Sequence, residues 1–110
     1  AGEYDVAVQA LAPLAKGNDD VAGEARHWAA RALIKSGKPA EAEQLLTSVK
    51  SGKETNKYSA QLALDLGDAL YDQPKRRDEA LKAYQSLVDK FPEDKLAAQG
   101  RYLCALTALE

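Results

Sequence analysis

The sequence predicts an all-α protein, an antiparallel helix-hairpin solenoid of about six helices, from two observations. Apolar residues recur with a 3.6-residue period along the chain, and no stretch alternates as a strand does. One spacing also occurs three times: an alanine, a large apolar residue four positions on, and another three positions later. The three occurrences are Ala7-Leu11-Leu14, Ala42-Leu46-Val49 and Ala80-Tyr84-Leu87. Alanines 35 and 38 residues apart are typical of solenoids, in which each unit buries its apolar face on a neighbour.

The start of the chain predicts two helices. The first is expected over residues 3–16, because a glycine–asparagine pair follows and such a pair is a typical helix C-cap. Asp19 or Asp20 can N-cap the second helix, which reaches Lys35. The turn at 36–39 then places a glycine just past one helix and a proline near the start of the next.

Two helices are expected in the middle of the chain. The third helix carries the anchor alanine of the second repeat and ends at Ser51-Gly52. The fourth begins at Thr55 or Asn56 and continues through Asp72. Both segments have helical periodicity and are separated by glycine and polar residues.

The last part of the chain predicts two further helices. A glutamine–proline step breaks the fourth helix, and the fifth begins near Asp78. It ends at Phe91-Pro92, because the residue before a proline resists helical geometry. The sixth covers residues 93–110. The connections are short, so consecutive helices should pack as antiparallel hairpins.

Composition excludes several classes of partner. The 110 residues are 45% hydrophobic and 29% charged, which fits one domain with a buried core. The net charge of −2 gives no electrostatic reason to expect nucleic acid or an anionic membrane. Cys104 is the single cysteine, so no intrachain disulfide can form, and we expect it as a small core residue. No targeting segment is recognisable, which leaves both the cytoplasm and the bacterial periplasm or cell envelope open.

Three groups of residues follow one common pattern. The third group is the most complete and consists of Leu66-Gly67, Leu70-Tyr71, Ala80, Tyr84, Leu87 and Pro92. The second consists of Ala29-Ala30, Leu33, Gly37, Ala42, Leu46 and Val49, and the first of Gly2, Ala7, Leu11 and Leu14. Together they resemble the tetratricopeptide repeat (TPR). The resemblance implies a right-handed superhelix of hairpins, with small residues where helices cross and large apolar residues between units.

The chain departs from this pattern at two joints. The spacing of 38 residues exceeds the family's period of about 34. The excess lies at 52–56 and around 73–77, where longer loops or an extended helix are expected. No proline closes the first two units. The segment 91–98 is similar to the linker of bacterial cell-envelope repeat proteins, in which a helix ends in a Tyr/Phe-Pro step.

The order of helix types predicts that residues 1–110 are a single repeat domain and a fragment of a larger protein, with half-repeats at both ends. The last helix is apolar nearly all round, so we expect it to meet a partner or a second copy of the chain. One side carries Leu96, Gly100, Leu103 and Thr107, and the rest carries Tyr102, Ala105, Leu106 and Leu109. The alternative is an ordinary amphipathic helix diluted by alanine and glycine.

Two polar stripes supply candidate binding residues on the inner helices. His27 and Arg31 are four residues apart on one helix and could grip a carboxylate. Asp65, Asp68 and Asp72 form an acidic stripe on the next inner helix, which would bind a basic peptide segment if it is functional. The alternative for both stripes is a set of solvated side chains on an exposed face.

Aromatic residues supply possible interface anchors, because such residues dominate interface energetics. Those considered are Trp28, Tyr71 and Tyr102, although aromatic residues at helical spacing also fit a core role. The sequence offers no catalytic set, no metal-ligand spacing and no phosphate-binding glycine loop. We therefore expect no enzyme activity, no metal and no cofactor.

These observations together predict a protein–protein interaction module. A peptide or a partner helix would bind in a concave groove lined by residues 22–35, 57–72 and 94–109. The partner-binding residues expected there are His27, Arg31, Asp65, Asp68 and Tyr71. The alternative is a structural scaffold that forms homo-oligomers through its exposed end helices. Neither nucleic-acid binding nor membrane insertion is expected.

Overall fold

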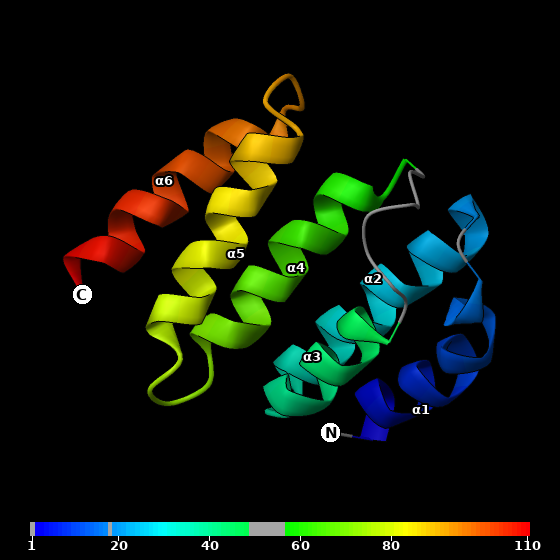
Figure 1. Cartoon of the computed structure of the whole chain (residues 1–110). Coiled ribbons are helices and arrows are strands. Elements are labelled where there is room, and N and C mark those ends of the chain that lie inside the picture. Colours follow the sequence, from blue (N-terminus) through cyan, green and yellow to red (C-terminus); the bar gives the residue numbers. More distant parts are fainter. Residues whose placement is uncertain (1, 18, 49–56) are drawn as a thin grey trace.

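A computed structural model describes residues 2–17, 19–48 and 57–110, and every regular element in these residues is a helix (Figure 1). The elements in chain order are α1 (Gly2–Leu11), the short 3-10 helix η1 (Ala12–Lys16), α2 (Asp20–Lys35), α3 (Pro39–Thr47), α4 (Ser59–Tyr71), α5 (Arg77–Lys90) and α6 (Leu96–Leu109). The predicted all-α fold of stacked helix hairpins is confirmed.

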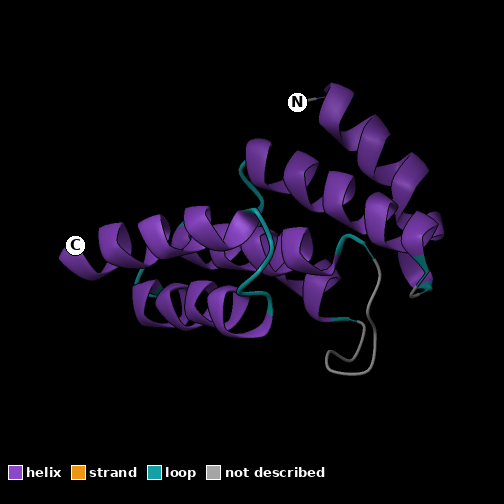
Figure 2. Cartoon of the chain, turned by 90° about the horizontal axis from the view of Figure 1, so that it is seen from above, coloured by secondary structure: helices purple, strands orange, loops and turns teal. Residues whose placement is uncertain are grey.

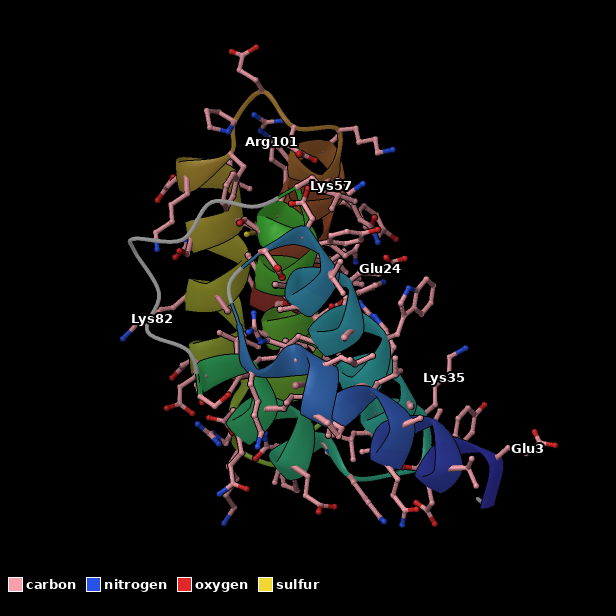
Figure 3. All side chains as sticks on the ribbon, turned by 90° about the vertical axis from the view of Figure 1, so that its right-hand side faces the viewer. Glu3, Glu24, Lys35, Lys57, Lys82 and Arg101 are labelled. Carbon is pink, nitrogen blue, oxygen red and sulfur yellow. The ribbon has the colours of Figure 1, made fainter. Side chains whose placement is uncertain are left out.

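The helices stack side by side into an elongated molecule of 36 × 29 × 21 Å (Figures 1 and 2). Within the stack, α2 contacts α4 and α4 contacts α6, so these three helices form a continuous row. The remaining long helices pack onto this row: α1 on α2, α3 on α2 and α4, and α5 on α4 and α6. Figure 3 shows Lys82 of α5 on the opposite side of the molecule from Glu24 and Lys35 of α2. We call the side of α2, α4 and α6 that faces away from α5 the inner face.

The ends of α2 follow the sequence signals. The Asp19 carboxylate accepts a hydrogen bond from the backbone N–H of Ala22 at 2.9 Å, which satisfies one of the free donors of the first turn. At the other end Gly37 adopts a φ of +80°, a conformation that favours glycine. The backbone N–H of Lys38 can then reach the carbonyl of Leu33 at 2.8 Å. The predicted N-cap and glycine turn are thus confirmed.

The first helix is shorter than predicted. The expectation was one helix over residues 3–16, but α1 ends at Leu11 and residues 12–16 form η1. Pro13 is the physical reason, because a proline removes a backbone donor and its ring clashes with the carbonyl four residues earlier. The tighter 3-10 geometry accommodates Pro13 within its first turn.

The predicted boundaries of the later helices are partly corrected. The sixth helix was expected from residue 93, but α6 begins at Leu96, whose backbone N–H is bound by the Asp94 carboxylate at 2.9 Å. The fifth helix begins and ends within a residue of its predicted limits. The expected helix end at 51–52 and the expected start at 55–56 lie outside the described residues, in which α3 ends at Thr47 and α4 begins at Ser59.

The core consists of two apolar clusters that meet at α4. The larger joins α4 and α5 through the buried residues Ala60, Leu64, Leu70, Ala80, Tyr84 and Leu87, with residues of α6 packed against it. The smaller joins α2, α3 and α4 through Ala30, Leu33, Ala42 and Ala69. The repeat anchors Ala42 and Ala80 are fully buried, as the predicted role of small residues at helix crossings requires.

Two glycines mark the closest helix crossings. A Cβ atom on Gly67 of α4 would lie 2.5 Å from Cδ1 of Tyr84 in α5. A Cβ atom on Gly100 of α6 would lie 3.0 Å from Cδ2 of Leu87 in α5. Any larger side chain at Gly67 would therefore push α4 and α5 apart.

The outer side of α6 is apolar and exposed. The exposed fractions of Tyr102, Leu106 and Leu109 are 65%, 39% and 85%, whereas Gly100 and Thr107 are buried on the opposite side. Apolar residues thus lie on both the buried and the exposed side of α6, and the expectation that this helix meets a partner or a second copy stays a prediction. No helix in the described part of the chain is both long and apolar enough to cross a bilayer.

Candidate functional site

Four of the five predicted site residues come together between α2 and α4. The Nδ1 atom of His27 lies 2.5 Å from Oδ2 of Asp65. Arg31 donates from Nε to Oδ1 of Asp65 at 2.8 Å and from Nη2 to Oδ2 of Asp68 at 2.5 Å. Residues three or four apart share one side of a helix, so the two stripes face each other across the helix pair. We call these four residues the polar joint.

Side chains from α4 and α5 complete the polar joint. The hydroxyl of Tyr84 donates to Oδ1 of Asp68 at 2.5 Å, and the amide of Gln61 donates to Oδ1 of Asp65 at 3.3 Å. Burial and the contact with Asp68 raise the pKa of the Tyr84 phenol, so it stays protonated and continues to donate. Burial lowers the pKa of Arg31, but Asp65 and Asp68 outweigh this effect and raise it above its usual value. Each of the two carboxylates of the joint is therefore held by more than one polar side chain.

Burial contradicts the alternative that both stripes consist of solvated side chains. Asp65 is 0% exposed and His27 is 8% exposed, so neither can act as a freely solvated group. The carboxylate that His27 and Arg31 bind is Asp65 of their own chain. Arg31 and Asp68 keep about a quarter of their side chains exposed, at 25% and 24%. Among the three aspartates of the acidic stripe, only Asp72 is exposed to solvent, as the alternative of solvated side chains requires.

The fifth predicted residue, Tyr71, lies at the end of α4 and takes part in a different contact. Its hydroxyl donates to the side-chain carboxylate of Glu110, and the guanidinium carbon of Arg77 lies 3.9 Å from the centre of its ring. The sequence interpretation missed Arg77, Glu110 and the hydroxyl of Tyr84. No local sequence signal could have shown that Glu110 contacts Arg77 and Tyr71, because it lies 33 residues from the first and 39 from the second.

Aromatic side chains border the polar joint on the inner face. Trp28 is 53% exposed, and its ring centre lies 4.5 Å from that of His27. The ring of Tyr58, before α4, also stacks on the imidazole of His27, with ring centres 6.4 Å apart. Trp28 is four residues after Glu24 and so projects from the same side of α2. Of the aromatic anchors considered from the sequence, Trp28 thus lies beside the predicted site.

The described part of the chain shows neither a metal site nor an activated thiol. Among residues 2–17, 19–48 and 57–110, no three His, Cys, Asp or Glu side chains are arranged to hold a metal ion. Cys104 is half-buried, and burial followed by the nearby Asp89 charge raises the pKa of its thiol. A raised pKa keeps the thiol protonated and unreactive at neutral pH.

These features define a helical-repeat protein: stacked antiparallel hairpins with small residues at the crossings and a row of helices along one face. A family model of the tetratricopeptide repeat matches residues 1–56 and 29–95, and the chain therefore belongs to this family. Repeats of this family generally mediate protein–protein interaction and are not catalytic. Comparison with curated proteins and with solved structures gave no match.

Proposed function

We propose that the inner face binds an extended peptide or a helix of a partner protein. The observation that carries this proposal is the half-exposed Trp28 next to the fixed charges of Arg31 and Asp68. A tryptophan offers a large rigid surface, and such residues supply most of the binding energy in many interfaces. The protein's membership of a protein-binding repeat family supports the same conclusion.

The five predicted site residues divide into two roles in this proposal. His27 and Asp65 are buried and act indirectly, by holding Arg31 in one orientation. Arg31, Asp68 and Tyr71 remain accessible and would contact the partner. Holding a long arginine side chain before binding reduces the entropy that it loses on complex formation. A segment that carries both charges next to an apolar side chain would match this surface.

Trp28 also provides the experiment, because it is the only tryptophan in the sequence. Peptides selected by phage display on the purified protein would be titrated while the emission of Trp28 is followed. We expect a blue shift on binding, since the partner would cover the exposed indole. Trp28→Ala should weaken binding at least tenfold by calorimetry, as is usual for an anchor residue.

The matched control for this experiment is Lys82→Ala on the opposite side of the molecule (Figure 3). This exposed residue of α5 should leave the affinity within about twofold, because substitutions outside the contact area have small effects. Selected peptides that bind Trp28→Ala as tightly as the natural protein would overturn the proposal. Circular dichroism of both variants should show unchanged helix content.

A second candidate function is a scaffold that self-associates through its end helices. The observation that favours it is the exposed apolar side of α6, with Tyr102, Leu106 and Leu109, together with Val6 of α1, which is 67% exposed. Light scattering over a concentration series would show a rising mass that Leu109→Glu suppresses. A monomer at every concentration would rule this function out and leave the first proposal intact.

A further inference from the structure

Side chains from the ends of α4 and α5 both bind one carboxylate, which belongs to the residue just after α6. The hydroxyl of Tyr71, at the end of α4, donates to the Glu110 side chain just after α6. Arg77, at the start of α5, donates from Nη1 to both oxygens of the same carboxylate, at 2.9 and 2.8 Å. Figure 1 shows the C-terminal end of α6 on the same side of the stack as the turn between α4 and α5.

The chemistry of Tyr71 and Arg77 suits a carboxylate ligand. The guanidinium of Arg77 lies over the Tyr71 ring at 3.9 Å, a cation–π contact that fixes its position. The Tyr71 hydroxyl and the Arg77 guanidinium then direct one O–H and one N–H donor to the same point. A carboxylate at this point accepts both hydrogen bonds, and both are strong because the acceptor is charged. The pKa of Glu110 is lowered, first by the hydrogen bond from Tyr71 and then by Arg77.

We propose that Tyr71 and Arg77 form a binding seat for an acidic side chain of a partner protein, and that Glu110 occupies this seat when no partner is bound. The proposal deepens the proposed function, on which it rests, because it names one chemical group that the partner presents beside the inner face. A glutamate side chain is the occupant in the free protein, so aspartate or glutamate is the ligand that the seat fits.

The resident contact is one that a partner can displace. The side chains of Arg77 and Glu110 are 45% and 35% exposed, and ion pairs this accessible contribute little to stability. Arg77 also uses a single nitrogen for both oxygens of Glu110. In the strongest arginine–carboxylate pairs two nitrogens bind two oxygens, so an incoming carboxylate can gain a contact that Glu110 does not make.

The neighbouring arginine shows the contrast. Arg76 binds Glu43 through both Nη1 and Nη2, at 2.5 and 3.0 Å, and its Nε donates to Glu79. All three guanidinium nitrogens of Arg76 are therefore engaged: Nη1 and Nη2 tie the turn before α5 to Glu43 of α3, and Nε binds Glu79 within α5. Two adjacent arginines thus have different roles, and only Arg77 is arranged to exchange its partner.

The test follows the side-chain Nε–Hε signal of Arg77 by nuclear magnetic resonance. The probes are three short peptides. The first has blocked ends and a single glutamate. The second is identical except that glutamine replaces the glutamate, and the third is this glutamine peptide with a free carboxyl terminus. We expect the glutamate peptide to shift the Arg77 signal saturably and the blocked glutamine peptide to leave it unchanged. Glu110→Gln should tighten binding about two- to fivefold, because a competing exposed ion pair is removed.

Variants of the seat separate the possible outcomes. Arg77→Gln and Tyr71→Phe should weaken the glutamate peptide, read by calorimetry, whereas Arg101→Gln on α6 serves as the matched control and should not. The proposal would be overturned if the Arg77 signal shifted only with the peptide that has a free carboxyl terminus. It would also be overturned if the glutamate peptide did not shift this signal in Glu110→Gln. If groove peptides still shift the Trp28 emission in that case, the proposed function stands. If Arg77 responds but Trp28→Ala binds selected peptides normally, the seat stands and the proposed function falls.

Discussion

The two sides of α4 are held by different forces. Towards α2 the contact is the polar joint, in which the fully buried Asp65 is bound by His27 and Arg31. Towards α5 the contact is apolar: Tyr84 packs against Gly67 so closely that there is no room for a Cβ atom. We call this second contact the apolar joint. The difference has a testable consequence. Substitutions that remove a charge should break the polar joint, and substitutions that enlarge a side chain should break the apolar joint.

The apolar clusters explain why the two joints differ. The cluster between α2, α3 and α4 contains three alanines and one leucine, so it buries little apolar surface per residue. The cluster between α4 and α5 contains larger side chains, among them Leu64, Tyr84 and Leu87. The polar joint supplements the smaller cluster and fixes one orientation of α2 on α4. Such a joint is sensitive to the loss of one partner, because the other charge stays buried and unpaired.

The largest effect is expected from Asp65→Ala in the polar joint. The change leaves Arg31 and His27 without the carboxylate that they share, and loss of one partner of a buried pair costs about 3–5 kcal/mol. Urea unfolding followed by circular dichroism measures the loss. The control is Asp72→Ala, an exposed member of the same stripe, which should change stability by less than about 0.5 kcal/mol. Equal effects of the two variants would contradict the assignment.

Gly67→Ala breaks the apolar joint by size alone. In an open helix position this change would stabilise by about 1 kcal/mol, because alanine favours helix. Here the added Cβ would lie 2.5 Å from Tyr84 Cδ1, so we expect a net loss of about 1–3 kcal/mol from overpacking. Gly2→Ala, at the open first residue of α1 where an added Cβ would meet nothing within 4 Å, is the control and should be neutral or stabilising, by at most about 1 kcal/mol. A stabilising Gly67→Ala would show that the crossing is looser than described.

Tyr84 links the two joints, and alkaline pH should reveal it. Its folded-state pKa is raised by burial and by Asp68, so its contribution is fully present below the unfolded pKa of about 10 and is lost as pH rises above that value. Between pH 9 and 11 this group alone should cost about 1 kcal/mol, because the unfolded phenol ionises and the folded one does not. Tyr84→Phe should show a shallower decline, and parallel declines would argue against this role.

The smallest effect is expected at an ion pair outside both joints. Lys38 and Asp5 lie 3.3 Å apart, with side chains 45% and 51% exposed. Exposed pairs typically contribute about 0.2–1 kcal/mol and are screened by salt. A double-mutant cycle on this pair should therefore give a coupling that disappears in 1 M salt. The polar joint should keep most of its coupling under the same conditions, because solvent ions do not reach Asp65.

The fold was predictable from the sequence because its signals are local. The alanine anchors at 42 and 80 and the glycine at 67 mark helix crossings by their size, and all three are buried. The break in the first helix also has a local signal, since Pro13 lies inside the expected helix, but the prediction of one helix over residues 3–16 did not use it. Helix boundaries that depend on one side-chain hydrogen bond, such as that of Asp94, leave a weaker signal.

The residues of the polar joint could be picked out from the sequence, but their contacts could not, and their role in partner binding stays a prediction. The stripes of α2 and α4 were found from residue spacing, yet their pairing across 34 to 38 residues depends on how the helices dock. Spacing alone therefore left two roles open, partner binding or solvated side chains, and did not show that the two stripes bind each other in the folded protein. The seat of Tyr71 and Arg77 was invisible for the same reason, because its resident carboxylate comes from the far end of α6.

A double-mutant cycle between Arg31 and Asp65 tests most directly whether buried charges hold α2 on α4. The variants are Arg31→Met, Asp65→Asn and the double change, each followed by urea unfolding. We expect a coupling of about 2 kcal/mol, because each single change leaves the other member of the pair without its partner and the double change does not. A coupling below about 0.5 kcal/mol, with the single effects simply adding, would contradict the polar joint as the element that positions Arg31 and Asp68 on the inner face.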